Sequence, residues 1–360
     1  MKNDKAIKCI VWDLDNTIWD GVLLESDNIV LKPGIKAIIE TLDSRGVLHS
    51  ISSKNDHVAA MAKLSEFGLS QYFLYPQIHW NIKSLSLKNI HEDLNIAMDA
   101  MLFVDDQEFE LDEVATAHPT LNCMNANKYH NLLNYPQLNP RFITVDSARR
   151  RKMYQADQKR KQAEQDCLMP HNEFLASLRM KLTIQLAEEE DLRRAEELTI
   201  RTNQLNATGR TFDYDELNKY RQSPEHELLL CELEDKYGSY GKIGLALINL
   251  KEEHWKIEMM LMSCRVMSRG VGTLLLTYIL HEAKMNNKLL LADFVDTGRN
   301  RMMNISYRFA GFTEKMSDGN GRFLLQNDCM QVAEFPSHVV LIDKCKLGQV
   351  RVIPELIDCA

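Results

Sequence analysis

Two carboxylates two residues apart, Asp13 and Asp15, follow a short apolar run at residues 7–12. In parallel α/β sheets, ligands bind at the carboxyl ends of the strands, so a substrate would meet these side chains there. One carboxylate can attack phosphorus while the other handles the proton on the leaving oxygen. A magnesium ion offsets the repulsion between such carboxylates and a phosphate. The pattern predicts a phosphoryl-transfer site.

Further polar residues stand at the ends of the elements that the sequence predicts next. We expect strands at 7–12, 47–52, 101–104 and 121–124, and helices at 33–45, 56–67, 83–94 and 109–117. This alternation is typical of a parallel sheet with helices on both faces. Ser53 ends the second strand and Lys83 opens a helix, while Asp105 and Asp106 follow the next strand.

The stretch Asp13-Leu14-Asp15-Asn16-Thr17, taken with these later residues, resembles the four motifs of the haloacid dehalogenase phosphatase superfamily in their order. The resemblance implies a nucleophile at Asp13 and a general acid/base at Asp15. It also implies phosphate binding by Ser53 and Lys83. The implied Mg²⁺ ligands are Asp13, Asp15, Asp105 and Asp106, with Glu110 in support.

The spacing of these motifs leaves no room for a cap domain. Asp15 and Ser53 are 38 positions apart, and Ser53 and Lys83 are 30 positions apart. Only a small flap at 21–31 fits. We therefore expect a capless site that is open to a large or protein-tethered substrate.

A second set of candidates lies in the other half of the chain. Strands are expected at 181–187, 227–234, 242–250, 254–263 and 289–294, and helices at 188–201, 270–285 and 299–309. Consecutive strands favour an α+β domain. Cys264 stands beside Arg265 and Arg269 before a Gly-containing turn and a helix, a setting that lowers the pKa of a thiol and raises its thiolate fraction.

The turn Arg269-Gly270-Val271-Gly272 resembles the acyl-CoA-binding turn of the GNAT acyltransferase superfamily, and its backbone N–H groups suit a pyrophosphate. Asn300, Tyr307 and Gly311-Phe312 resemble the later signature of that superfamily. The resemblance implies that Cys264 faces bound pantetheine. The residues implied to bind pantetheine or the acyl group are Arg265, Arg269, Gly270, Gly272, Asn300 and Tyr307.

The pairing of the two halves resembles the FkbH family over roughly residues 5–345, through VWDLDNTIWDGVL, SSKND, RTNQLN and SCRVMSRGVG. The resemblance implies that 1,3-bisphosphoglycerate loses phosphate and that its glyceryl group passes through a thioester at Cys264. The implied acceptor is the phosphopantetheine thiol of an acyl carrier protein in polyketide-type biosynthesis. Two departures are Asp20, where the family often has Gly, and the run NQLNATGRTFD.

We expect a haloacid-dehalogenase-like, Rossmann-like domain at 1–145, a charged helical linker at 146–180, a GNAT-like domain at 181–345 and a tail at 346–360. The charged stretch 146–167 is interpreted as a solvated connecting helix or as a basic docking surface. A net charge of −8 argues against a nucleic-acid partner. With no long apolar run, no signal-peptide pattern and no CxxC pair, we expect a cytoplasmic protein that makes no membrane contact.

Three alternatives have to be weighed against the acyltransferase–phosphatase. They are a magnesium-dependent phosphatase whose second domain only docks a carrier protein, an N-acetyltransferase fused to a phosphatase, and a non-catalytic scaffold. The intact set of phosphatase residues argues against a scaffold. A cysteine in place of an amine-activating carboxylate argues against an N-acetyltransferase.

Overall fold

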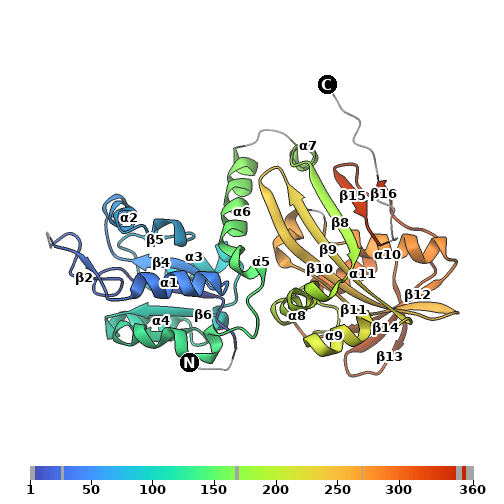
Figure 1. Ribbon diagram of the computed structural model, residues 1–360, viewed down its shortest axis with the longest axis horizontal. Helices are drawn as coiled ribbons and strands as arrows, with labels where there is room; N and C mark the ends of the chain where they lie inside the picture. The colour runs from blue at the N-terminus through green and yellow to red at the C-terminus, as the bar shows by residue number, and fades with distance from the viewer. Residues whose placement is uncertain (1–4, 26–27, 167–169, 270, 346–350, 354–360) are drawn as a thin grey trace. The chain divides into compact units, whose positions relative to one another are not determined.

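The computed structural model describes residues 5–25, 28–166, 170–269, 271–345 and 351–353. The chain forms two compact units, residues 1–158 and 159–360 (Figure 1). Each unit has its own sheet and its own hydrophobic core.

The first unit is built on five strands in the order β5-β4-β1-β6-β7, and all neighbouring pairs are parallel. The strands β1 and β4 are buried along their whole length, as expected where helices cover both faces. The elements are β1 Cys9–Trp12, β2 Trp19–Asp20, β3 Val30–Leu31, α1 Ile35–Ser44, β4 Leu48–Ser53, α2 His57–Glu66, β5 Gln77–Ile78, α3 Lys83–Leu94, β6 Met101–Asp105, α4 Glu108–Ala117 and β7 Asn122–Asn125.

Local signals explain where several of these helices begin and end. The Asp56 side chain accepts a hydrogen bond from the backbone N–H of Ala59 and caps α2. Asn95 adopts a left-handed conformation, with φ of 50°, and ends α3. These boundaries match the predicted helices within one or two residues.

The flap predicted at 21–31 lies in a small hairpin, where β2 pairs with β3. In the described residues, the chain between β1 and β4 contains only this hairpin and α1, and the chain between β4 and α3 contains only α2, a single 3₁₀ turn and β5. No cap domain is inserted in these described segments, and the carboxyl edge of the sheet carries only short connections.

The second unit contains a nine-stranded mixed sheet in the order β13-β14-β12-β11-β10-β9-β8-β15-β16. One core cluster joins α10 and α11 to the sheet, and another joins α8 and α9 to it. The elements are α7 His171–Ser177, β8 Met180–Leu186, α8 Leu192–Arg201, α9 Tyr214–Arg221, β9 His226–Asp235, β10 Gly238–Leu250, β11 His254–Met262, α10 Leu274–Met285, β12 Leu289–Val295, α11 Arg301–Phe309, β13 Thr313–Ser317, β14 Arg322–Asn327, β15 Val339–Asp343 and β16 Arg351–Ile353.

The predicted fold class, a Rossmann-like α/β domain followed by an α+β domain, is therefore confirmed. The first sheet is wholly parallel and alternates with helices. The second sheet is mostly antiparallel, with parallel pairs at β11–β12 and β8–β15. No helix in the described part of the chain combines the length and the apolarity that crossing a membrane requires.

The charged stretch forms α5 (Val145–Ala148) and α6 (Arg150–Gln165), and the division between the two units falls within α6. The prediction of a fully solvated helix is wrong for Arg160, which is completely buried. Its guanidinium donates to both carboxylate oxygens of Asp235, at 2.7 and 2.8 Å, and lies 3.8 Å from the ring centre of Tyr240. A buried arginine of this kind needs such partners.

Candidate active site

Four of the predicted phosphatase residues, Asp13, Lys83, Asp105 and Asp106, meet at the carboxyl edge of the first sheet. Lys83 opens α3, and its Nζ lies 2.7 Å from Asp13 Oδ1 and 2.5 Å from Asp105 Oδ2. Both ion pairs are buried, with Lys83 4% and Asp13 5% exposed. Asp13 follows β1, and Asp105 is the last residue of the neighbouring strand β6. Three elements that are distant in sequence therefore hold one compact charged cluster.

The acidic side of this cluster fits a divalent cation. One carboxylate oxygen from each of Asp13, Asp105 and Asp106 lies within 4.8 Å of the others. Oδ1 of Asp106 is buried and has no hydrogen-bond partner, which is costly unless a ligand fills that place. Oxygen donors of this type are the ligands that Mg²⁺ prefers. These three aspartates would hold the ion that the sequence predicts.

The cluster also perturbs the proton affinities of its members. Burial, followed by the charge of Asp13, raises the pKa of Asp105 to about 6 and also raises the pKa of Asp106. Burial disfavours the charged form of Lys83, but the carboxylates of Asp13 and Asp105 outweigh this and raise the pKa of Lys83. The lysine therefore stays protonated and offsets part of the negative charge.

Asp15 occupies a separate position. Its Oδ1 accepts hydrogen bonds from Trp19 Nε1 at 2.8 Å and from the backbone N–H of Leu23 at 3.1 Å, and its Oδ2 accepts one from Asn55 Nδ2 at 3.0 Å. Its carboxylate is not part of the three-aspartate group, so the structure does not support the predicted metal role for this side chain. Burial raises the pKa of Asp15, which suits the predicted proton donor.

The segment after β4 supplies two further features. Ser53, the predicted phosphate-binding residue, ends β4 and is 3% exposed. Lys54 Nζ lies 2.6 Å from Glu110 Oε1, so the predicted supporting carboxylate of Glu110 is engaged in an ion pair. Asn55, which orients Asp15, was not identified from the sequence. Its position two residues after Ser53 in SSKND was the available signal.

A buried hydrogen-bond relay connects the two strands that bear Asp13 and Ser53. Trp12 Nε1 donates to Nδ1 of His49 at 3.0 Å, and Nε2 of His49 lies 3.2 Å from the carbonyl oxygen of Ile39. Nε2 therefore carries the ring proton, and the imidazole is neutral. Burial lowers the pKa of His49 to about 3. No sequence pattern marked this histidine, because its role depends on packing.

The predicted acyl-transfer turn lies in the second unit. A 3₁₀ segment, Cys264–Arg269, follows β11, but the Cys264 side chain and Gly270 lie outside the described residues. Arg265 Nε donates to Ser263 Oγ at 3.3 Å. Arg269 is 1% exposed, and its Nη1 lies 2.9 Å from Oε2 of Glu164 in α6. The guanidinium of Arg269 thus has an internal carboxylate partner and is buried from ligands, contrary to its predicted role.

The parallel strands β11 and β12 pair only over residues 254–257 and 289–292, and beyond these pairs they diverge. The chain itself fills the resulting notch. The backbone N–H of Ala207 donates to Met260 at 2.8 Å, that of Met262 donates to Leu205 at 2.8 Å, and that of Val295 donates to Ala207 at 2.9 Å. The start of the NQLNATGRTFD run, whose role the sequence left open, is thus a bridge between two strands.

Asn300 locks this bridge in place. It is fully buried, and its Nδ2 donates to the carbonyl oxygens of Asn206 at 2.9 Å and Val295 at 2.8 Å. Its Oδ1 accepts from the backbone N–H of Thr297 at 3.0 Å. The prediction that Asn300 binds pantetheine is not supported, because its amide is inaccessible and already bonded within the fold.

Tyr307 is also fully buried, between Phe294 and Phe312. Its hydroxyl has no hydrogen-bond partner, and burial raises the pKa of Tyr307 well above its ordinary value. The side chain is part of an aromatic core. An added Cβ at Gly272 would meet no atom within 4 Å, so no close contact requires glycine there.

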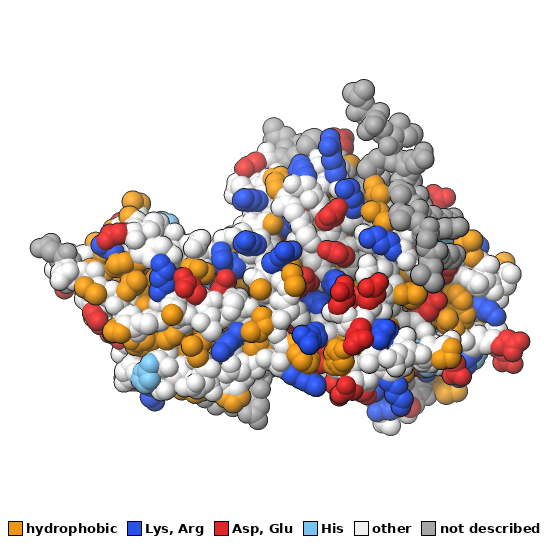
Figure 2. All heavy atoms as spheres, in the orientation of Figure 1, with side chains coloured by type: hydrophobic (Ala, Val, Ile, Leu, Met, Phe, Trp, Pro, Cys, Tyr) orange, Lys and Arg blue, Asp and Glu red, His pale blue; other side chains and the backbone are white. Residues whose placement is uncertain are grey.

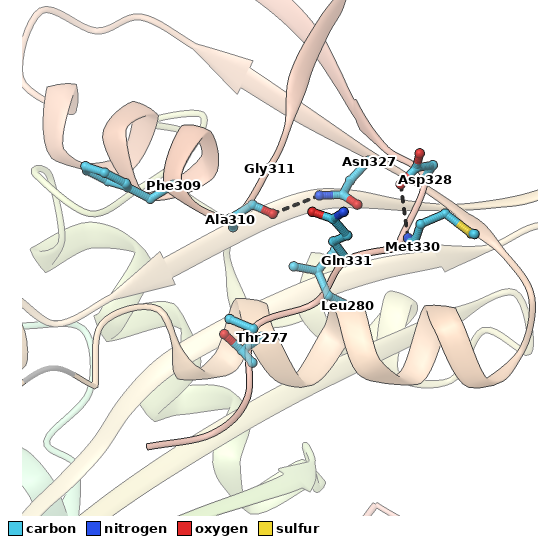
Figure 3. Close-up of a pocket in the computed structure, with 10 residues that line it drawn as sticks. Thr277, Leu280, Phe309, Ala310, Gly311, Asn327, Asp328, Met330 and Gln331 are labelled. Atoms are coloured by element: carbon cyan, nitrogen blue, oxygen red, sulfur yellow. Dashed lines mark hydrogen bonds between the residues drawn. The ribbon is translucent and has the colours of Figure 1, made fainter. Parts of the chain in front are cut away.

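A cavity of about 390 Å³ opens beside α10, the end of α11 and the residues after β14 (Figure 3). Thr277 and Leu280 line it from α10, and Asn327 Nδ2 donates to the Ala310 carbonyl oxygen at 2.8 Å on the opposite side. None of the predicted acyl-binding residues lines this cavity.

No family model matches the chain, and no curated protein matches it significantly. Solved structures resemble parts of it. The N-terminal part of BF1531 from Bacteroides fragilis, which contains a phosphatase domain complexed with Mg, is 27% identical over 38% of this chain, with a TM-score of 0.34. The chain spans 41% of the length of that structure.

Acetyltransferases resemble another part of the chain. The ribosomal-protein-S18-alanine N-acetyltransferase of Escherichia coli is 15% identical over 42% of this chain and 97% of its own, with a TM-score of 0.33. An acetyltransferase of the GNAT family from Streptococcus pneumoniae is 19% identical over 41% and 98%, with a TM-score of 0.31. These are similarities to parts of the chain only.

Proposed function

We propose that the protein is a bifunctional glyceryl transferase and magnesium-dependent phosphatase of the FkbH type. It removes phosphate from 1,3-bisphosphoglycerate and passes the glyceryl group through a Cys264 thioester to the phosphopantetheine thiol of an acyl carrier protein. The observation that carries the phosphatase part is the cluster of Asp13, Asp105 and Asp106 around Lys83, with one buried and unpartnered carboxylate oxygen.

In the phosphatase step, the Asp13 carboxylate attacks phosphorus and the ester oxygen leaves. Asp15, whose pKa is raised by burial, donates the proton to that oxygen. Water then hydrolyses the aspartyl phosphate and regenerates Asp13. Lys83 neutralises negative charge beside the nucleophile. A bound magnesium ion supplies further charge neutralisation for the phosphoryl oxygens.

In the transfer step, the Cys264 thiolate attacks the acyl phosphate carbonyl and inorganic phosphate leaves, which gives an enzyme thioester. The pantetheine thiol then exchanges with the cysteine. One thioester replaces another, so positioning matters more than driving force. This assignment is supported by the sequence setting of Cys264 and by its place in the turn after β11.

Intact-protein mass spectrometry after mixing with 1,3-bisphosphoglycerate tests the transfer step. We expect a covalent acyl adduct on the wild-type protein and none on Cys264→Ser, while both hydrolyse a generic phosphate monoester in the presence of Mg²⁺. Carrier-protein loading by Cys264→Ser at the wild-type rate would refute the enzyme thioester. Loss of both activities with an unchanged melting temperature would show that the two sites are coupled.

The second candidate is a magnesium-dependent phosphatase whose second unit only docks the carrier protein. The bridge that Leu205–Ala207 form between β11 and β12 favours it, because the backbone groups it uses on these strands are bonded within the fold and not to an inserted arm. Absence of any acyl adduct, with phosphatase activity retained, would select this candidate. The same filled notch argues against the third possibility, an N-acetyltransferase that inserts CoA between these strands.

A further inference from the structure

The turn that carries Asp15 is bonded to the base of the hairpin of β2 and β3. Asn16, the next residue, adopts a left-handed conformation with φ of 52°. Its backbone N–H donates to the Gly21 carbonyl oxygen at 3.3 Å, and its Oδ1 accepts from the Gly21 N–H at 3.1 Å. The Lys32 N–H donates to the Ile18 carbonyl oxygen at 3.0 Å. The hairpin is therefore fixed beside the Asp15 carboxylate.

Trp19 is the hairpin residue whose side chain reaches Asp15. It is 0% exposed, so it is not among the hydrophobic side chains that Figure 2 shows on the displayed face of this unit. Its ring lies 6.3 Å from that of Phe67, centre to centre, and its Nε1 donates to Asp15 Oδ1. A phenylalanine would fill this apolar space equally well, but a buried indole N–H needs an acceptor. Asp15 provides it.

The donors around Asp15 distinguish its two oxygens. A carboxylate oxygen has two lone pairs, and both of those on Oδ1 are used, by Trp19 Nε1 and by the backbone N–H of Leu23. Among the residues that the structure describes, Oδ2 accepts only from Asn55 Nδ2. One acceptor position therefore remains, and it is on Oδ2. Since Asp15 is only half-buried, a substrate can reach it.

The orientation of the Asn55 amide is fixed as well. Its Oδ1 accepts from the backbone N–H of Asp56 at 2.9 Å, so its NH₂ group faces Asp15. Asn55 is 2% exposed, which keeps water from replacing these bonds. It follows β4, the neighbour of β1 in the sheet, whereas Trp19 and Leu23 come from the hairpin. The carboxylate of Asp15 is therefore held from two sides.

We propose that the hairpin of β2 and β3 positions the general acid, with Trp19 and Asn55 as positioning residues for Asp15. Because they fill Oδ1 and leave one place on Oδ2, the proton that passes to the substrate is carried by Oδ2. This inference rests on the proposed function. It gives the hairpin a role in proton transfer, in addition to its place beside the substrate.

The reaction assigns one proton to this oxygen in each half. The Asp13 carboxylate forms a bond to phosphorus while the bond from phosphorus to the ester oxygen breaks, and that oxygen takes the proton from Asp15 Oδ2 and leaves as an alcohol. Water then attacks the aspartyl phosphate, returns a proton to Oδ2 and releases inorganic phosphate. A positioned proton donor contributes about 10²–10⁴-fold to the rate, and a displaced carboxylate loses part of this.

The leaving group separates a positioning role from a merely structural one. Phenyl phosphate releases a strongly basic phenolate, which needs the proton, whereas 2,4-dinitrophenyl phosphate releases a weakly basic one, which does not. The value of kcat/KM covers the steps up to release of the phenol. We therefore compare the ratio of kcat/KM for phenyl phosphate to kcat/KM for 2,4-dinitrophenyl phosphate in full-length, Mg²⁺-loaded protein. The fraction of folded protein cancels in this ratio.

Trp19→Phe and Asn55→Ala should each lower this ratio about tenfold, because each removes a donor that orients the acid. The loss should fall on phenyl phosphate, while kcat/KM for 2,4-dinitrophenyl phosphate stays within about threefold of wild type. Asp15→Asn removes the acid and should lower the ratio about 100-fold or more. The double variant Trp19→Phe/Asn55→Ala should approach that value.

Asn122→Ala is the matched control. Asn122 is 1% exposed in the same unit, and its Nδ2 donates to the Met101 carbonyl oxygen at 3.3 Å. The variant therefore loses a buried amide, as Asn55→Ala does, but no donor to Asp15. It should keep the wild-type ratio even if it lowers the melting temperature.

An unchanged ratio in Trp19→Phe, together with a lowered ratio in Asp15→Asn, would overturn the inference and leave the proposed function intact. Equal decreases in Asn55→Ala and Asn122→Ala would also overturn it, because the effect would then come from lost packing. If Asp15→Asn keeps the wild-type ratio, or if wild-type protein hydrolyses neither ester with Mg²⁺, the proposed phosphatase mechanism itself fails.

Discussion

His49 should make the first unit lose stability as the pH falls. The imidazole is buried and neutral, accepting from Trp12 and donating to the Ile39 carbonyl, and its pKa is lowered to about 3. In an unfolded chain the pKa of a histidine is about 6.5. Between pH 6.5 and pH 3 the imidazole of His49 is therefore protonated in the unfolded state but stays neutral in the folded state. Stability is present above pH 6.5 and is lost progressively below it.

The size of the effect follows from the distance between the two pKa values. pH 5 is about 1.5 units below the pKa of the histidine in the unfolded chain. At about 1.36 kcal/mol per unit, this corresponds to a loss of about 2 kcal/mol in the free energy of unfolding. For a unit of 158 residues, that is a drop in Tm of about 4–8 °C.

Urea denaturation of the wild-type protein and of His49→Gln at pH 7.5 and pH 5 measures this loss in the free energy of unfolding. Other groups titrate in both proteins, so the difference between their pH dependences isolates His49. We expect the wild type to lose about 2 kcal/mol more than the variant over this range. His130→Gln, at an exposed histidine of the same unit, should behave like wild type. If His49→Gln shows the wild-type pH dependence, the buried neutral assignment is wrong.

Three further predictions follow from the two units. Asp13→Asn should lower Mg²⁺-dependent monoester hydrolysis by several powers of ten in a phosphate-release assay, since the nucleophile is lost; near-normal turnover would displace the nucleophile to another residue. Excess EDTA should abolish that turnover, Mg²⁺ should restore it, and Asp106→Asn should weaken Mg²⁺ binding by at least about tenfold in calorimetry; full activity in EDTA would contradict the metal site. Asp235→Asn leaves a buried arginine without its carboxylate and should destabilise the second unit by about 3–5 kcal/mol in chemical denaturation. Glu234→Gln, at the exposed neighbour paired with Lys181, should change the free energy of unfolding by less than about 1 kcal/mol. Equal effects of the two substitutions would show that burial of the Arg160–Asp235 pair does not matter.

The sequence predicted the elements of the first unit well because its signals are local. Strands such as Cys9–Trp12 are short apolar runs, and helices such as Lys83–Leu94 are bounded by residues with clear start or stop preferences. Parallel topology then brings strand ends together. Their places at the ends of predicted elements, together with the resemblance to the four phosphatase motifs, assigned Asp13, Lys83 and Asp105 to one site.

The residues that the sequence missed depend on contacts between distant segments. Asn55 orients Asp15 across 40 positions, and His49 accepts from Trp12 across 37. Arg160 sits in a helix without an apolar stripe and was interpreted as solvated, but a carboxylate 75 positions away draws it into the interior. No periodicity marks such pairs, because they are fixed only when separate elements pack.

The two sets of motif residues also differ in whether the fold already bonds their polar atoms. This difference decides how strongly each set supports a binding site. In the first unit, Asp106 keeps a buried oxygen with no partner, and Asp13 shares one lysine with Asp105, so the cluster is electrostatically incomplete without a cation. In the second unit, the Asn300 amide is bonded within the fold and Arg269 has a carboxylate partner. A site needs polar atoms that the protein has not already satisfied. The proposed phosphatase activity therefore rests on geometry, whereas the proposed acyl transfer rests on the chemistry of Cys264 and on the experiment that removes its sulfur.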